Sequence, residues 1–150
     1  MAEKYNGQSF DVNEGCKRFK VKKNITANMG DIAVMSGGYV TVGASGTSLK
    51  FVGTFAEDVD STALANDGDA YGEYIGPQVN FVRDTREFWL DNSTAGDAIV
   101  QADCGKVAYI NGARSVTDTS TSRSVAGTIM ALSPDSAYVK IAGQPFGIGL

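Results

Sequence analysis

The residue types that most often carry chemistry are scarce in this chain of 150 residues. Histidine is absent, so the sequence lacks the usual general base and the commonest metal ligand. The two cysteines, Cys16 and Cys104, lie far apart in the sequence, and we expect them to be free thiols in a reducing cytoplasm. Neither a phosphate-binding loop nor a dinucleotide-binding fingerprint is present. The sequence therefore predicts a protein that is not an enzyme, with no catalytic residues and no cofactor.

Acidic residues gather in one stretch, where calcium binding is the chemistry to consider. Their spacing does not match the twelve-residue calcium loop with its closing Glu. This favours a solvated acidic loop and predicts no metal site. The residues concerned are Glu57, Asp58, Asp60, Asp67 and Asp69.

Basic residues gather near the N-terminus, where they alternate with apolar residues as on a strand with one basic face. Residues 1–23 carry 6 basic and 3 acidic side chains, whereas the rest of the chain carries 7 basic and 14 acidic ones. So short a run on an acidic protein favours an ordinary solvated strand or a strand that contacts a protein over one that contacts nucleic acid. The candidate contact residues are Lys17, Arg18, Phe19, Lys20, Lys22 and Lys23.

A second charged run, at residues 83–87, comes directly before the single tryptophan. A polar turn leading into a strand with a core Trp is one interpretation. An interface is the other, because Arg and Trp are enriched among the residues that dominate protein binding. Arg83, Arg86 and Trp89 are therefore candidates for an oligomer interface.

Glycine punctuates the whole chain, which contains 18 glycines and 3 prolines. The glycines stand beside short apolar runs, as in tight turns between short strands. Helix signals are confined to residues 59–66, where a turn fits equally well. About ten short strands predict an all-β fold, a compact β-barrel or β-sandwich. The expected strands lie at 19–25, 32–35, 39–42, 49–55, 71–75, 79–82, 87–90, 98–100, 107–110, 127–132 and 137–141.

The same pattern suggests three parts: an N-terminal arm at 1–24, a β domain at 25–142 and a C-terminal tail at 143–150. The polar stretch 117–124 is expected to be a flexible surface loop. No apolar run approaches the length of a membrane span, so we expect no membrane partner.

Two pairs of segments hint at internal repetition. Residues 30–34 resemble 96–100, and residues 51–55 resemble 125–129, in the same order along the chain. A duplicated β unit and a chance similarity between Gly-Asp turns are both open interpretations.

Several short Gly-based segments are ordered as in a family of phage proteins. They lie at 30–34, 40–42, 51–55, 68–72, 95–100, 105–107, 124–129 and 137–141. In these segments, spread over roughly residues 25–142, the chain resembles the decoration or cement proteins of phage heads. The resemblance implies a β-barrel or sandwich that binds the outside of a capsid at junctions between subunits. The C-terminal segment 144–150 departs from the family pattern.

The resemblance also implies partners and a location. The major capsid protein would be the partner, and the basic residues near the N-terminus would be its contacts. The chain would form a homo-oligomer, with a trimer favoured over a dimer, on the capsid exterior of the virion after synthesis in the bacterial cytoplasm. Two alternatives stay open: a tail-tube or fibre-associated structural protein, and a carbohydrate-binding β module with Trp89 and either Tyr71 or Tyr74 as stacking residues.

Overall fold

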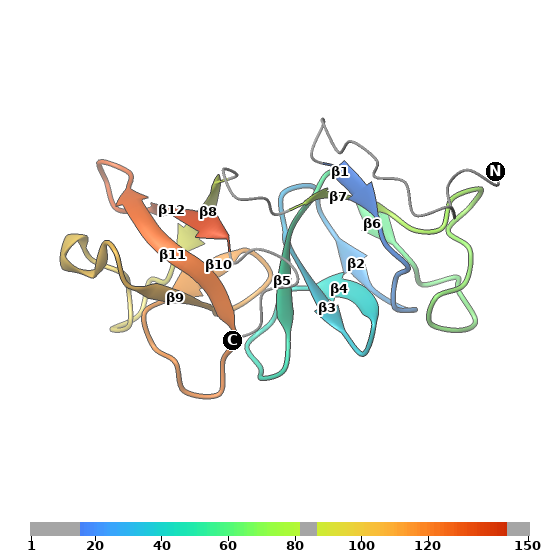
Figure 1. Ribbon diagram of the computed structural model, residues 1–150, viewed down its shortest axis with the longest axis horizontal. Coiled ribbons are helices and arrows are strands. Elements are labelled where there is room, and N and C mark those ends of the chain that lie inside the picture. The colour runs from blue at the N-terminus through green and yellow to red at the C-terminus, as the bar shows by residue number, and fades with distance from the viewer. Residues whose placement is uncertain (1–15, 82–86, 144–150) are drawn as a thin grey trace, which may run out of the picture.

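The computed structural model describes residues 16–81 and 87–143, which fold almost wholly into short strands. Figure 1 shows two bodies side by side, β1–β7 in blue to green and β8–β12 in yellow to red. The predicted all-β class is confirmed. Within the described ranges the one helix is a single turn, and no helix is long and apolar enough to cross a membrane. The elements are β1 (Cys16–Arg18), β2 (Thr26–Ala27), β3 (Ile32–Ser36), β4 (Tyr39–Val42), β5 (Lys50–Phe55), β6 (Val59–Asp60), β7 (Gln78–Phe81), β8 (Glu87–Asn92), η2 (Gln101–Asp103), β9 (Val107–Ile110), β10 (Ser115–Thr117), β11 (Val125–Leu132) and β12 (Tyr138–Gly143).

The C-terminal body is a closed barrel with the strand order β10-β8-β12-β11-β9. Four of its pairings are antiparallel, and the barrel closes through the parallel pairing of β10 with β8. Every strand of this barrel therefore has two neighbours, which removes the exposed edges that invite stray pairing.

The N-terminal body is a five-stranded sheet with the order β1-β7-β5-β3-β4. Its two ends are joined by a parallel bridge between Val21, just after β1, and Val40 of β4. The Lys22 amide donates to the Val40 carbonyl at 3.0 Å, and the Val40 amide donates to the Lys20 carbonyl at 2.8 Å. Because the sheet curls back on itself in this way, we call it the N-terminal barrel. The small β2–β6 sheet packs Ala27 and Val59 against its core.

The two barrels share one topology. In chain order, β1, β3, β4, β5 and β7 correspond to β8, β9, β10, β11 and β12. Both sets have the same order in the sheet, and in both the first strand or its extension meets the third in parallel. The chain is therefore an internal duplication at the level of structure.

Matching hydrogen bonds support the correspondence. Gly30 and Gly105, which precede β3 and β9, have φ angles of 94° and 93°. The Gly30 amide donates to the Phe55 carbonyl, and the Gly105 amide donates to the Ile129 carbonyl, both at 2.8 Å. In both barrels the strand residue donates in return to the residue after the glycine, at 2.9 Å.

A second pair of glycines occupies equivalent bulges in β5 and β11. Gly53 and Gly127 each follow one extra residue that interrupts the pairing with β3 or β9. A Cβ atom on Gly53 would overlap the carbonyl oxygen of Asn80, and one on Gly127 would overlap that of Ala142. Both positions lack space for any side chain because the neighbouring strand approaches so closely.

Of the two segment pairs that hinted at a repeat in the sequence, one lies in corresponding strands and the other does not. Residues 51–55 and 125–129 do lie in corresponding strands, β5 and β11. The counterpart of 30–34 is 105–109, because Gly105 and not Gly96 stands before the matching strand. Residues 98–100, predicted to be a strand, belong to the connection before η2.

Corresponding positions also form the two cores. In the N-terminal barrel the central side chains are those of Val21, Ala33, Val40, Val52, Phe55 and Val79. Their counterparts by register are Asn92, Ala108, Val116, Ala126, Ile129 and Ile141, all buried. Asn92 is the one polar member. Its amide group donates to two carbonyls and accepts from the Ile99 amide, all at 2.9 Å, so it is buried without losing hydrogen bonds.

The barrels are joined by an apolar contact and by two polar ones. Ile32, Val34 and Phe51 project from the outer face of β3 and β5 into the C-terminal core. The Phe51 ring meets the Phe88 ring edge-on at 5.6 Å between centroids. At one side of the junction, Arg114 of the C-terminal barrel pairs with a buried carboxylate of the N-terminal barrel. At another, the Ser124 hydroxyl accepts from the Leu49 amide and donates to the Gly46 carbonyl.

Some predicted boundaries need correction. Residues 16–24 of the expected arm belong to the folded body, through β1 and the buried Val21, and residues 1–15 lie outside the described residues. Residues 71–75 form a turn with one isolated bridge and not a strand. The segment 59–66 begins with strand β6 followed by turns, and it holds no helix. The expected tail is described only at Gly143, the last residue of β12.

Candidate functional site

Two large aromatic side chains stand on the outside of the C-terminal barrel. Trp89 lies on β8 and Tyr138 on β12, and their side chains are 52% and 50% exposed. Register places Lys140 opposite Trp89 and Asp91 opposite Tyr138, so the two rings are diagonal neighbours on one face. The residues between them on each strand, Leu90 and Val139, are buried in the core, so alternation directs the two rings outward.

The Trp89 ring is held by its neighbours. The Lys140 ammonium lies 5.3 Å from the centre of the ring, within the range of a cation–π contact. The same ammonium lies 3.7 Å from the carboxylate of Glu87, two residues before the tryptophan on β8. A large apolar ring is thereby oriented in advance of any partner, which reduces the entropy lost on binding.

A shallow groove runs beside the two rings. Its other wall is the turn between β11 and β12, with Leu132, Ser133 and Pro134. The turn is fixed by hydrogen bonds: the Ser133 hydroxyl donates to the Asp135 carboxylate at 2.8 Å, and the Tyr138 amide donates to that hydroxyl at 3.0 Å. The Ser133 hydroxyl, aided by the Ala137 amide, lowers the pKa of the Asp135 carboxyl group.

Met130 adds further apolar surface on β11, the strand next to β12, with 47% of its side chain exposed. We call this surface the aromatic face and define it by Trp89, Met130, Leu132, Pro134 and Tyr138. Exposed Trp, Tyr and Met together on a rigid β surface are typical of protein interfaces. The face can bind apolar or planar groups, while Glu87 and Lys140 supply polar contacts at one side.

The six basic-run candidates differ in their burial and contacts. Lys17 is exposed, with its ammonium 5.9 Å from the centre of the Phe81 ring. Phe19 packs beside the N-terminal core, with its ring 5.8 Å from that of Phe81. Lys20, Lys22 and Lys23 follow in a segment whose backbone closes the N-terminal barrel, and Val21 between them is fully buried. Phe19 and Val21 pack into the core, and Lys20 between them is exposed, as the alternation in the sequence predicted.

Arg18 is committed to contacts within its own barrel. Its guanidinium carbon lies 3.6 Å from the centre of the Tyr74 ring. One of its nitrogens donates to the Gly76 carbonyl at 2.9 Å and lies 3.7 Å from the Glu57 carboxylate. These contacts hold the 71–76 turn against β1. They also place the guanidinium against one face of the Tyr74 ring, a candidate stacking residue of the carbohydrate-binding alternative, which is itself 47% exposed.

Among the oligomer-interface candidates, Trp89 is placed on the aromatic face. Arg83 and Arg86 lie outside the described residues. The interpretation of Trp89 as a core residue is therefore wrong, and the structure leaves it available to a partner.

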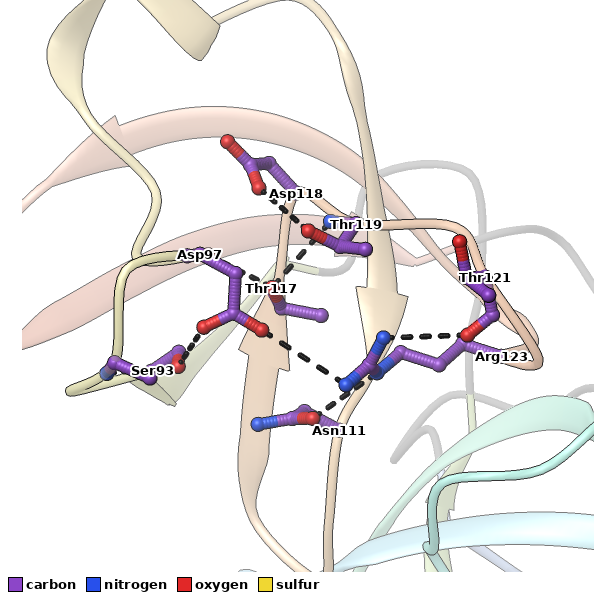
Figure 2. Close-up of polar contacts among 9 residues, drawn as sticks. Ser93, Asp97, Asn111, Thr117, Asp118, Thr119, Thr121 and Arg123 are labelled. Carbon is purple, nitrogen blue, oxygen red and sulfur yellow. Dashed lines mark hydrogen bonds and ion pairs between the residues drawn. The ribbon is translucent and has the colours of Figure 1, made fainter.

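The loop after β10 carries a polar network instead of being loosely held (Figure 2). Asp97 accepts from the Ser93 hydroxyl at 2.6 Å and lies 3.8 Å from an Arg123 nitrogen. Arg123 also donates to the Asn111 side chain at 3.0 Å. The Ser93 hydroxyl, then that of Thr117, then the charge of Arg123 lower the pKa of Asp97, although partial burial opposes them. The predicted flexible loop 117–124 is thus anchored at both ends, where its first and last residues are buried.

The acidic stretch accepts hydrogen bonds from main-chain amides of its own turns and of segments that pack beside it. Asp58, Asp67 and Asp69 each accept a hydrogen bond from a main-chain amide at 2.8–2.9 Å. Asp60 accepts from the hydroxyl and the amide of Thr62, and these two bonds lower its pKa. In the part of the chain that the structure describes, no group of three or more His, Cys, Asp or Glu side chains is placed to hold a metal ion. Cys16 and Cys104 are both free and half-buried.

No family model, no curated protein and no solved structure matches the chain.

Sequence reasoning identified Trp89 but missed Tyr138 and Lys140. A signal was present, because Val139 and Ile141 are buried and their alternation implies that Tyr138 and Lys140 face outward. The pairing of β12 with β8 could not be predicted from local patterns, since four other elements separate the two strands in the sequence.

Proposed function

We propose that this protein is a structural virion protein that binds the outer surface of a phage capsid at junctions between subunits and stabilises it. The partner would be the major capsid protein, and the protein would act by binding and not by catalysis. The observation that carries the proposal is the aromatic face, in which Trp89 and Tyr138 stand half-exposed on paired strands of a closed barrel. The resemblance to phage decoration proteins supplies the identity of the partner.

The physical basis of such a role is linkage. A protein that binds the assembled shell and not its separate subunits raises the free energy needed to take the shell apart. Contacts to more than one subunit at a junction add through effective concentration, so each contact can be modest. A closed barrel suits this role because its aromatic face is positioned before it meets the capsid.

The test is co-sedimentation of the purified protein with expanded, undecorated capsids of the phage that encodes it, followed by thermal unfolding of the capsids. We expect saturable binding and a higher capsid melting temperature. Absence of binding would contradict the proposal. If the isolated protein then formed long tubes, the tail-tube alternative would replace it.

A carbohydrate-binding module is the second candidate, favoured by the pair of half-exposed rings. Trp89 and Tyr138 could stack on sugar rings, whereas one face of the Tyr74 ring already contacts the Arg18 guanidinium. Glycan-array binding that is lost on Trp89→Ala substitution, without any capsid binding, would favour this function.

A further inference from the structure

Because the two barrels share one topology, the face of the N-terminal barrel that packs at the junction has an equivalent face on the C-terminal barrel. In the N-terminal barrel, the outer face of β3 and β5 carries Ile32, Val34 and Phe51, each at most 1% exposed. They are buried because the C-terminal barrel packs over them, with the Phe51 ring against Phe88. Register shows which residues of the C-terminal barrel occupy the same places.

Those places are filled by Val107, Tyr109 and Val125. Tyr109 pairs with Val125 across β9 and β11 as Val34 pairs with Phe51 across β3 and β5. Val107 faces Thr128 as Ile32 faces Thr54. All three positions are apolar again and less deeply buried than their counterparts, although Val125 also lines a hollow together with Phe51 of the N-terminal barrel. Val107 is 42% exposed, and the other two are half-buried.

Apolar side chains at these positions are unusual for a face that stays in water. A sheet with one solvated face normally alternates apolar residues inward with polar residues outward. Here the inward positions are apolar as expected, with Ala108, Ile110 and Ala126 fully buried. The apolar residues on the outward side therefore indicate a contact surface.

We propose that the outer face of β9 and β11, carried by Val107, Tyr109 and Val125, is a self-association surface that receives the N-terminal barrel of a second copy of this chain. Within one chain, the equivalent face already receives a barrel of the same topology. Within one chain, the end of the C-terminal barrel near Phe88 already packs on the outer face of β3 and β5. In the proposed contact, the corresponding end of the N-terminal barrel of a second copy packs on the outer face of β9 and β11.

That end also offers complementary chemistry. By register Lys17 stands where Phe88 stands in the C-terminal barrel, since Lys17 pairs with Val79 and Phe88 pairs with the equivalent Ile141. A lysine ammonium is a favourable partner for an aromatic ring such as that of Tyr109. The contact joins two different surfaces, so repeated copies would close into a ring or extend as a filament. This inference does not depend on capsid binding.

The first test is sedimentation velocity of the full chain over a wide concentration range. We expect wild type to associate with rising concentration and Val107→Lys to remain a monomer. Val100→Lys is the matched control, because Val100 is 54% exposed outside both barrels, and it should associate as wild type does. Circular dichroism checks that each variant is folded, and Tyr109→Ser should repeat the loss if Val107→Lys does not fold. A monomeric wild type would overturn the proposal. So would folded Val107→Lys and Tyr109→Ser variants that associate as strongly as wild type.

A mixing experiment tests which surface the second copy contributes. Val107→Lys keeps its N-terminal barrel intact, so a tagged form should bind the free β9–β11 face of wild type and limit further growth. The tagged variant should therefore be recovered together with untagged wild type. Failure to recover wild type would mean that the β9–β11 face pairs with itself, and the N-terminal barrel would be ruled out as its partner.

Discussion

Arg114 is the residue whose polar contacts join the two barrels most directly. Its Nε lies 3.1 Å from the buried Asp31 carboxylate, and one of its terminal nitrogens donates to the Met29 carbonyl at 2.7 Å. The same carboxylate accepts from the Asn28 amide, so it also shapes the turn before β3. One ion pair thus links a turn of the first barrel to the hairpin of the second.

Replacing Arg114 with Ala is expected to lower the free energy of unfolding by about 1–3 kcal/mol, because the Asp31 carboxylate loses its charged partner. Urea unfolding measures the change. Lys106→Ala is the control, since the Lys106 ammonium lies 3.6 Å from Asp103 but its side chain is 69% exposed. We expect the control to change stability by only about 0–1 kcal/mol. Equal effects of the two substitutions would refute the role of Arg114 as a junction contact.

Asp97 makes stability depend on pH. Its pKa in the folded protein lies below the ordinary value because the Ser93 hydroxyl, then Thr117 and Arg123, favour the ionised form. The carboxylate therefore stabilises the fold above the unfolded-state pKa of about 3.9. This stabilisation is lost as the pH falls through the lower folded-state pKa.

Asp97→Asn should accordingly show a smaller loss of stability between neutral and acidic pH than wild type. Ser93→Ala should change the profile in the same direction, since it removes the main hydroxyl donor. Urea unfolding at a series of pH values provides the comparison. Profiles that run parallel to that of wild type would show that Asp97 is not a source of the acid sensitivity.

The sequence predicted the exposure and contacts of some residues but not of others. Trp89 was a candidate from its type and its neighbours, and the structure exposes it. Arg18 was a candidate from the charge run, but its guanidinium is engaged by Tyr74 and Gly76, which lie far along the chain. Such engagement depends on tertiary packing, which local charge patterns do not encode.

At the level of elements, the two bulged strands make the strictest demand on the sequence. Gly53 and Gly127 lie against the carbonyl oxygens of neighbouring strands, where a side chain would collide with backbone. We expect Gly53→Ala and Gly127→Ala each to destabilise the protein by about 1–3 kcal/mol or more, as overpacking does. Thermal unfolding tests this. Gly96→Ala is the control, because a Cβ atom at Gly96 would meet no other atom within 4 Å. If only one of the two bulge variants were destabilised, the two strands would not be equivalent.

Most strands were predictable, because apolar runs between glycines are the sequence form of short strands. Strand β10 (Ser115–Thr117) was missed, since only its central Val116 is apolar and it leads into a polar stretch. Strand β6 consists of two residues and is defined by its pairing with β2, so no periodicity could reveal it. The pairing order of the strands lay beyond local patterns altogether.

For the whole molecule, duplication explains why one chain has two barrels and two distinct outer surfaces. The N-terminal barrel buries the outer face of β3 and β5 at the junction, whereas the equivalent face of the C-terminal barrel is half-buried to exposed. The aromatic face lies on other strands, β8 and β12, with the turn that precedes β12. Capsid binding and self-association therefore predict losses from different substitutions.

The central claim is that the aromatic face binds the capsid, and a binding titration on expanded, undecorated capsids tests it most directly. Wild type is compared with Trp89→Ser/Tyr138→Ser and with Met29→Ser, which replaces a 61% exposed apolar side chain elsewhere. We predict that the double variant, folded by circular dichroism, binds about tenfold or more weakly, as expected for the loss of aromatic anchors. Met29→Ser should bind as wild type does. A folded double variant with undiminished affinity would contradict the claim.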